Sequence, residues 1–273
     1  MKGPITTMLL MALFINSYAQ KLTEVWRTDT VLKSPESVLY DASTKTIFVA
    51  NINGKSDEKD GNGFITQLNV DGSVKQLQWI KGLNAPKGMA IVKGKLYVAD
   101  IGELVQIDIK KSKIEKRYPA PEAVFLNDVA AGKTGEVFVS DSRINKVYLL
   151  KNGKFSKWLE DQSFDKINGL FVEDSFLYIG SKVIHRVNIK TKEMQVIQED
   201  CGGIDGLEKD AKSNFIFSNW VGRIYYLEGK NITKMLDLTQ EKINTADIHF
   251  ANAIDLLLVP TFLDNRVIAY RLE

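Results

Sequence analysis

Apolar and polar residues alternate along this chain with a period of two rather than 3.6, and β-branched and aromatic residues dominate the apolar positions. Such alternation, interrupted by Gly, Asn, Asp or Lys, predicts strands joined by turns. The pattern also repeats: an apolar pair is followed by a polar turn and then by a second apolar run. These second runs cover 47–51, 96–100, 137–141, 177–181, 215–219 and 257–261.

The length of the repeat predicts the fold. The apolar pairs of successive units begin at Ser37, Gly88, Asp128, Gly169, Gly206 and Asp247, in steps of 51, 40, 41, 37 and 41 residues. One unit therefore has the length of a four-stranded propeller blade. Third runs at 103–109, 146–150, 183–189 and 223–227 and more polar fourth runs at 114–118 and 155–159 complete the units. We expect an all-β, six-bladed β-propeller.

The two ends of the repeat predict how the ring closes. The last unit ends after its third run, 266–272, while an unassigned strand covers 24–29, ahead of the first unit. We expect this N-terminal strand to complete the last blade, because closure protects an edge that would otherwise be exposed.

The first unit is longer than the others because of a polar, glycine-rich stretch at 51–63, which predicts a loop. Asp57, Glu58 and Asp60 raise the alternative of a calcium loop, but their spacing and the missing distal Glu do not fit an EF-hand. A solvated insertion over one face is the favoured interpretation.

Composition fits one globular domain over 20–273. Apolar residues make up 44% and charged residues 26% of the 273-residue chain, which is enough for a sizeable core. The formal charge is +2, and Lys and Arg are scattered, so no basic patch for nucleic acid is apparent.

The first 19 residues resemble a secretory signal peptide. Lys2 precedes an apolar stretch at 8–15, and Ser17-Tyr18-Ala19 forms a small-x-small cleavage site. The stretch is too short to span a membrane, which makes an anchor the weaker alternative. We expect cleavage near Ala19 and export to a bacterial periplasm or beyond. The single Cys201 cannot form an intramolecular disulfide, and a closed ring of this size needs none.

A column of six residues immediately precedes the first strands of the units, and five of them are polar or charged. If these strands surround one axis, the column becomes a ring. Its members are Glu36, Lys87, Asn127, Asn168, Asp205 and Ala246.

Four members of this ring are hard oxygen donors, with no His or Cys among them. Glu36, Asn127, Asn168 and Asp205 suit Ca²⁺ rather than zinc, and their two negative charges balance the ion. Mg²⁺ and Mn²⁺, as well as Zn²⁺, are alternatives. Water or substrate would fill the remaining positions. The competing interpretation is that Asn and Asp cap turns here, as they often do, but four in one repeat column favour a metal.

Four short segments carry a resemblance to a known family. Ser34-Pro35-Glu36, Leu126-Asn127-Asp128, Ile167-Asn168-Gly169-Leu170 and Ile204-Asp205-Gly206-Leu207 resemble the metal-binding segments of the SMP-30/gluconolactonase/LRE-like six-bladed propellers, which are distantly related to paraoxonases and strictosidine synthases.

The resemblance covers essentially the whole predicted mature chain and implies a divalent-metal hydrolase, usually a lactonase and sometimes a phosphotriesterase. It implies Glu36, Asn168 and Asp205 as core metal ligands. Asn127 would contact the metal, its water or the substrate. Together with the donor set, it implies that Ca²⁺ polarises a lactone or ester carbonyl while Asp205 positions or deprotonates the attacking water. Asp128 is a second candidate base, or else it orients the Asn127 loop.

Two positions depart from the family pattern. Sugar-lactone members commonly carry an Arg where this chain has Phe125, which argues against a sugar acid lactone. Lys87 places a cation in the ligand column. Pointed inward, it would weaken metal binding or bind a substrate carboxylate. Pointed outward it would be an ordinary solvated Lys, which is favoured because Lys is rarely buried unless paired.

Other candidate residues are less specific. His249 could face the channel and contact substrate, as a channel His does in paraoxonase-like relatives, although a hydrogen-bonded core His is commoner. His185 is expected on a blade face and Cys201 as a small buried residue. Trp220 could line a pocket. No G-x-S-x-G elbow supports a serine hydrolase.

Two function classes follow from these observations. One is an exported metal-dependent lactonase or esterase acting on a small-molecule substrate. The other is an exported propeller that binds a ligand or protein without turnover and uses Ca²⁺ structurally, since the fold alone hosts both.

Overall fold

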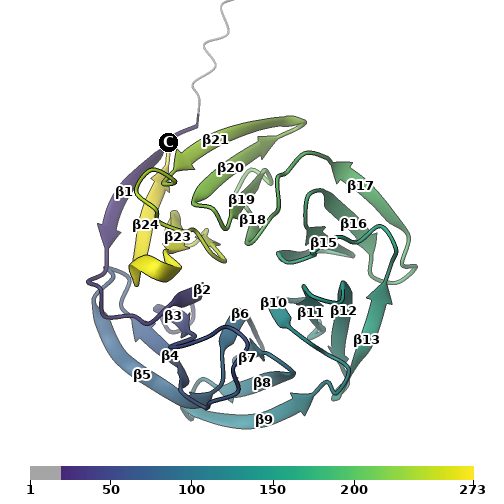
Figure 1. Cartoon of the computed structure of the whole chain (residues 1–273), viewed down its shortest axis with the longest axis horizontal. Coiled ribbons are helices and arrows are strands. Elements are labelled where there is room, and N and C mark those ends of the chain that lie inside the picture. Colours follow the sequence, from purple (N-terminus) through teal and green to yellow (C-terminus); the bar gives the residue numbers. More distant parts are fainter. Residues whose placement is uncertain (1–19) are drawn as a thin grey trace, which may run out of the picture.

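The strands of this protein form six antiparallel four-stranded sheets around a central axis, in a computed structural model that describes residues 20–273 (Figure 1). The predicted six-bladed propeller is confirmed. The predicted signal peptide lies outside the described residues.

Each of the first three blades is a meander in which sequence order runs from the channel outward. The first is β2 (Pro35–Asp41), β3 (Thr46–Asn51), β4 (Gly63–Leu68) and β5 (Val74–Leu83). The second is β6 (Pro86–Val92), β7 (Lys95–Asp100), β8 (Glu103–Asp108) and β9 (Lys113–Pro119). The third is β10 (Leu126–Ala131), β11 (Val137–Asp141), β12 (Lys146–Lys151) and β13 (Lys154–Glu160).

The next two blades follow the same order, and the sixth begins in the same way. The fourth is β14 (Leu170–Glu173), β15 (Phe176–Gly180), β16 (Ile184–Asn188) and β17 (Met194–Gln198). The fifth is β18 (Leu207–Lys209), β19 (Phe215–Asn219), β20 (Arg223–Glu228) and β21 (Asn231–Asp237). The sixth contains β22 (His249–Ala251), β23 (Leu256–Pro260) and β24 (Val267–Leu272), with the short 3₁₀ turn η1 (Phe262–Asp264) between β23 and β24.

The N-terminal strand closes the ring. β1 (Leu22–Arg27) pairs antiparallel with β24, with Leu22 opposite Leu272 and Arg27 opposite Ile268. Figure 1 shows the purple β1 lying outside the yellow β24. The predicted closure is confirmed, with the strand two residues earlier than the sequence suggested. On the channel side, Ser37 and Asp247 form a parallel bridge between the first and last blades.

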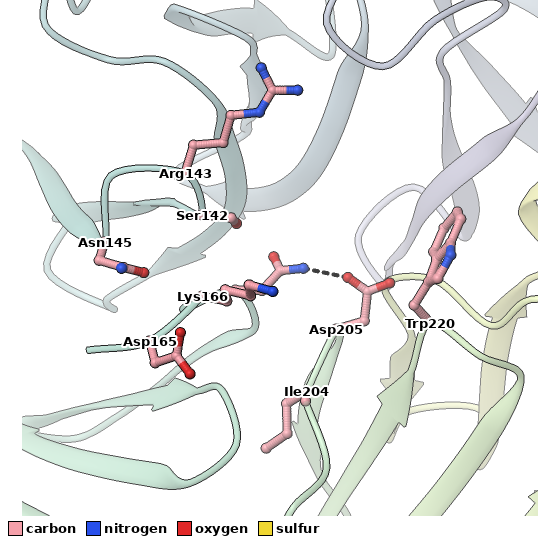
Figure 2. Close-up of a pocket in the computed structure, with 10 residues that line it drawn as sticks. Ser142, Arg143, Asn145, Asp165, Lys166, Ile204, Asp205 and Trp220 are labelled. Carbon is pink, nitrogen blue, oxygen red and sulfur yellow. Dashed lines mark hydrogen bonds between the residues drawn. The ribbon is translucent and has the colours of Figure 1, made fainter. Parts of the chain in front are cut away.

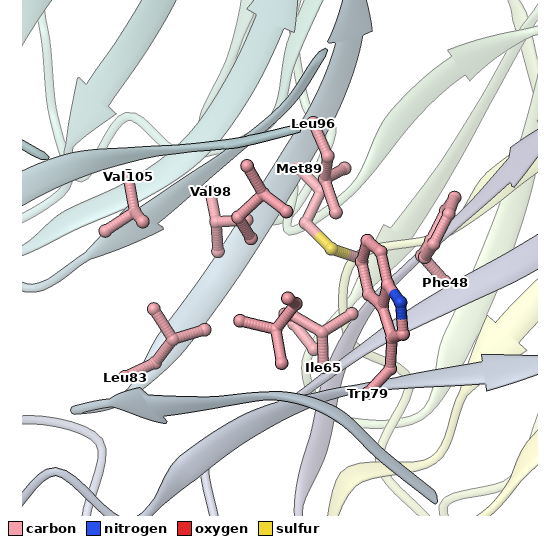
Figure 3. Close-up of a cluster of buried hydrophobic side chains, with 11 residues drawn as sticks. Phe48, Ile65, Trp79, Leu83, Met89, Leu96, Val98 and Val105 are labelled. Atoms are coloured by element: carbon pink, nitrogen blue, oxygen red, sulfur yellow. The ribbon is translucent and has the colours of Figure 1, made fainter. Parts of the chain in front are cut away.

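The hydrophobic core is divided among the interfaces between neighbouring blades. Figure 3 shows one cluster, in which Trp79 and Phe48 of the first blade pack against Met89 and Val98 of the second. Similar clusters occupy the other five interfaces. A blade with period-two alternation has apolar residues on its faces, and only a neighbouring blade covers them. This arrangement brings all six inner strands around one channel.

The segment between β3 and β4 is a loop, as predicted. The loop contacts two other blades. Asp57 forms an ion pair with Arg143 of the third blade, and the Ser56 carbonyl accepts a hydrogen bond from Lys87 of the second. In residues 20–273, no helix has the length and apolar character needed to cross a membrane.

Candidate functional site at the mouth of the channel

The predicted ring column lies at one mouth of the central channel. Its members stand at or just before the inner strands of six different blades, so the propeller geometry brings them together. Five of the six are buried, and Asn168 is half-buried. All except Ala246 line the same cavity.

Polar residues at the ends of the second strands fix the loops that carry the ring. Asn51 accepts a hydrogen bond from the Lys33 amide at 2.9 Å. Asp100 accepts one from the Ala85 amide at 2.8 Å, and Asp141 accepts one from the Val124 amide at 2.7 Å. Each bond lies two or three residues before a ring residue. The repeat therefore contains a second polar column that positions the first.

Two cavities meet at the ring. The first, which we call the apolar cavity, has a volume of about 360 Å³ and is lined by Glu36, Ile52, Ser56, Lys87, Phe125, Asn127, Asn168, Asp205, Trp220 and Phe262. The second, which we call the side cavity, has a volume of about 570 Å³ and is lined by Ser142, Arg143, Asn145, Asp165, Lys166, Asn168, Gly203, Ile204, Asp205 and Trp220 (Figure 2). Asn168, Asp205 and Trp220 belong to both walls.

The two ring carboxylates are held in an environment that disfavours their charge. Burial raises the pKa of Glu36 well above its ordinary value, the nearby Asp205 carboxylate raises it further, and Lys87 opposes the shift. Burial and the Asp128 carboxylate raise the pKa of Asp205 to about 7. One oxygen of Glu36, Oε2, is buried without a hydrogen-bond partner in the described residues. A cation between these groups would lower both pKa values.

The two ring amides contribute differently. Asn127 donates from Nδ2 to the Ser142 hydroxyl at 3.0 Å, which leaves its Oδ1 for another partner. Asn168 donates from Nδ2 to Asp205, as the dashed line in Figure 2 shows. A cation bound through the Asn168 oxygen would therefore require the side-chain amide to flip, so that its oxygen and nitrogen exchange places.

Lys87 points inward, and the expectation of a solvated side chain was wrong. It is 1% exposed, and its Nζ donates to the carbonyls of Ser56 at 2.7 Å and Ala85 at 2.9 Å. Nζ also lies 4.5 Å from the centre of the Phe125 ring. These contacts replace the hydration that a buried ammonium loses. Burial still lowers the pKa of Lys87 to about 8, against the opposing charge of Glu36.

A second carboxyl layer lies next to the ring. Asp128 accepts hydrogen bonds from the backbone amides of Leu170 at 2.5 Å and Val129 at 2.6 Å, and it does not line either cavity. Burial raises its pKa to about 7. Burial and the Asp128 carboxylate also raise the pKa of Asp247 well above its ordinary value. This placement agrees with a role for Asp128 in orienting the loop rather than in contacting substrate.

The remaining predicted residues divide between cavity and core. Trp220 lines both cavities, and Phe125 lines the apolar cavity. His249 lines neither; its Nδ1 lies 2.6 Å from Glu208 Oε1. Cys201 is buried, at 3% exposure, as expected, and His185 lies in β16 and is buried, at 1% exposure.

The donor set of the ring fits a hard divalent cation. Two carboxylates, one free amide oxygen and one amide that can turn supply oxygen ligands, and the unpartnered Glu36 Oε2 is an acceptor that a cation would satisfy. Among residues 20–273, no group of three or more His, Cys, Asp or Glu side chains is arranged to hold a metal. A cation here would therefore depend on the amides.

Comparison with known proteins supports the architecture. No protein-family model and no curated protein matches this chain. Several solved structures do, among them three that are distant in sequence.

A catalytically inactive variant of virginiamycin B lyase from Staphylococcus aureus, with quinupristin, has a TM-score of 0.64 at 14% identity, over 93% of this chain and all of that one. A streptogramin B lyase has a TM-score of 0.66 at 11% identity, over 93% of this chain and 98% of that one. A provisionally assigned gluconolactonase has a TM-score of 0.66 at 15% identity, over 94% of this chain and 93% of that one. The shared feature is the propeller fold. At these identities, the likeness is evidence for the fold alone.

Several residues around the mouth were missed by sequence reasoning. Ile52, Ser56, Arg143, Lys166 and Phe262 line the cavities but lie outside the aligned strands, Phe262 in η1 and the others in loops. The one sequence feature that could have identified these residues is their position, because each follows the end of a second strand or precedes a ring residue by a few positions.

Proposed function

We propose that this protein is a metal-dependent hydrolase of a lactone or related ester, with Ca²⁺ as the preferred ion. One observation carries the proposal: oxygen-bearing side chains from four blades converge on one cavity, and a buried Glu36 oxygen there has no partner. Glu36, Asn127, Asn168 and Asp205 would hold the cation, which when bound would polarise the substrate carbonyl.

The chain's own residues suit the remaining tasks of such a reaction. Lys87 has three N–H donors and gives two to backbone carbonyls, so one is left for an oxygen of the substrate. Asp205 stands at the junction of both cavities, where it can orient or deprotonate a water molecule. Phe125, Trp220 and Phe262 line one side of the cavity, where they can pack against an apolar part of the substrate.

A calcium titration combined with a lactone and aryl-ester hydrolysis panel tests the proposal. We expect Ca²⁺-dependent turnover in the wild type and its loss in Asp205→Ala. Asp71→Ala is the control, because Asp71 lies in an exposed turn and, within residues 20–273, its carboxylate accepts hydrogen bonds only from Ser73. Absence of Ca²⁺ binding would overturn the metal site.

The same experiment separates the alternative. A binding propeller with a structural ion would bind Ca²⁺ tightly and show no turnover across the panel. That result would overturn the proposed hydrolase activity and support the proposed metal site.

We also propose export to the periplasm or beyond, on the basis of the sequence at 1–19. The intact mass of protein recovered from the exported fraction would show a chain beginning near Gln20. A mass retaining residues 1–19 would contradict cleavage.

A further inference from the structure

The side cavity differs from the apolar cavity in charge. Its wall carries two cations, Arg143 and Lys166, and two carboxylates, Asp165 and the ring residue Asp205. The Asp165 carboxylate is paired with a residue outside the cavity wall, since its Oδ2 lies 2.8 Å from Nζ of Lys182. With a divalent ion neutralising Glu36 and Asp205, the side cavity would be an electropositive pocket beside the ring.

Arg143 is held in place from two sides. Its guanidinium carbon lies 4.5 Å from the centre of the Phe125 ring, and Nη2 lies 2.8 Å from Asp57 Oδ2. A guanidinium that lies over an aromatic ring and makes one ion pair retains further N–H donors for other partners. The Arg143 guanidinium can therefore donate hydrogen bonds to an anion while it keeps both of these contacts.

Lys166 supplies the second positive charge. No ion-pair partner is found for it in the part of the chain that the structure describes. The loop that carries it is fixed, because the following Ile167 amide donates to Asn145 Oδ1 at 3.3 Å. Figure 2 shows its side chain extending toward Asp205, with Arg143 above both residues in this view.

The apolar cavity offers the complementary surface. Trp220 and Phe262 meet edge to face, with ring centres 4.5 Å apart and planes at 74°. With Phe125 and Ile52 they form an aromatic-lined wall beside the ring. Trp220 is 42% exposed, so much of its indole is available to a ligand.

We propose that the ligand of this site joins an aromatic or other apolar group to a carboxylate. The apolar group would occupy the apolar cavity, and the carboxylate would bind Arg143 and Lys166 in the side cavity. The inference rests on the proposed function: the ester or lactone bond would lie between these groups, where both cavities share Asn168 and Asp205. Phe125 serves both parts, since it faces the apolar cavity and stacks on Arg143.

The test compares a matched pair of probes by calorimetry on the calcium-loaded full chain: 4-phenylbutyrate and the neutral 4-phenylbutanamide. We expect the carboxylate to bind about 10-fold more tightly, the value of one charge-assisted hydrogen bond. Arg143→Gln should reduce this preference to about 2-fold or less, and Trp220→Ala should weaken both probes alike.

Asp57→Asn is the matched control for Arg143→Gln. It removes the same ion pair but keeps the guanidinium, so the preference for the carboxylate should persist. If Asp57→Asn abolished the preference as completely, the loop rather than Arg143 would be responsible. If the preference survived in the double variant Arg143→Gln/Lys166→Gln, the carboxylate would be binding the ring cation. Either result would overturn the inference.

The outcome is distinguishable from failure of the proposed function. Binding preference without hydrolysis of any ester would retain the ligand class and reject the hydrolase. Hydrolysis that is indifferent to a substrate carboxylate would reject the ligand class and retain the hydrolase.

Discussion

Glu36 is the residue on which a cation at the mouth would depend most directly. It is buried, one of its oxygens lacks a partner, and Lys87 compensates its charge only in part. Replacing the carboxylate by an amide of the same shape removes charge while keeping volume.

We predict that Glu36→Gln lowers calcium affinity by roughly 100-fold or more, since even residues behind the ligands typically change metal affinity by 10- to 100-fold. Isothermal titration of Ca²⁺ measures the effect. Glu122→Gln, at an exposed position, should match the wild type. Unchanged affinity in Glu36→Gln would place the cation elsewhere.

Lys87 is the ring position at which the prediction from sequence was wrong. A lysine is usually solvated, but here two carbonyls and an aromatic ring surround its ammonium group. One of those carbonyls belongs to Ser56, 31 residues earlier in the chain. No local pattern reports a contact between loops of different blades.

At the scale of elements, inner strands approach one another closely enough to require glycine. A Cβ on Gly88 would lie 2.4 Å from Asp128 Oδ1 and 2.5 Å from Asp128 Cα. Because backbone is among the clashing atoms, the neighbouring strand itself would have to move.

We predict that Gly88→Ala lowers the free energy of unfolding by about 2 kcal/mol or more, a cost typical of overpacking. Gly54→Ala is the control, because its nearest neighbours are side-chain atoms of Asn62 and Asp60 at 3.3 Å or more. Chemical denaturation measures both. Equal stability of the two variants would show that the inner strands can separate freely.

His185, in β16, is expected to make the free energy of unfolding depend on pH. It is buried, neither ring nitrogen has a hydrogen-bond partner in the described residues, and burial lowers its pKa despite the Asp161 carboxylate. Below the unfolded pKa of about 6.5, the unfolded chain binds a proton that the folded chain resists, so stability is lost as pH falls through this range.

We predict that His185→Phe removes part of the loss of stability between pH 7 and pH 5. Phe164 already packs edge to face with this ring at 5.2 Å, so an aromatic replacement fits. Denaturation across pH measures the slope, and pH 8 is the internal control because the imidazole is neutral there in both states. An unchanged slope would assign the pH dependence to other groups.

At the scale of the whole molecule, stability depends on closure. Each blade buries its faces only against its neighbours, and β1 supplies the outer strand of the last blade. Leu22 belongs to the cluster between the fifth and sixth blades, and Trp26 packs against the cluster between the sixth and first.

We predict that a chain beginning at Asp29 loses on the order of 10 °C or more in Tm relative to one beginning at Gln20, because β24 becomes an open edge and two clusters lose residues. Scanning calorimetry measures the difference, and light scattering should reveal association through the exposed edge. A monomer with the same Tm would mean that the N-terminal strand is dispensable.

The repeat made most of the fold predictable. Second strands such as β11 and β19 begin and end where the pattern placed them, and β1 is displaced by only two residues. The ring was predictable for the same reason, since equivalent positions in equivalent blades must face one axis. The residues around the mouth were not predictable. Arg143, for example, lies over the Phe125 ring and pairs with Asp57, which is 86 positions away in the sequence.

The sequence by itself determined the strands, the number of blades, the closure and the column of oxygen donors. These follow from periodicity and repetition, which are properties of local sequence. Only the tertiary structure decided that Lys87 is buried, that Asp128 lies behind the ring, and that the mouth divides into an aromatic and a cationic cavity. Those features depend on contacts between loops of different blades, where burial and charge are set by neighbours that no repeat pattern specifies.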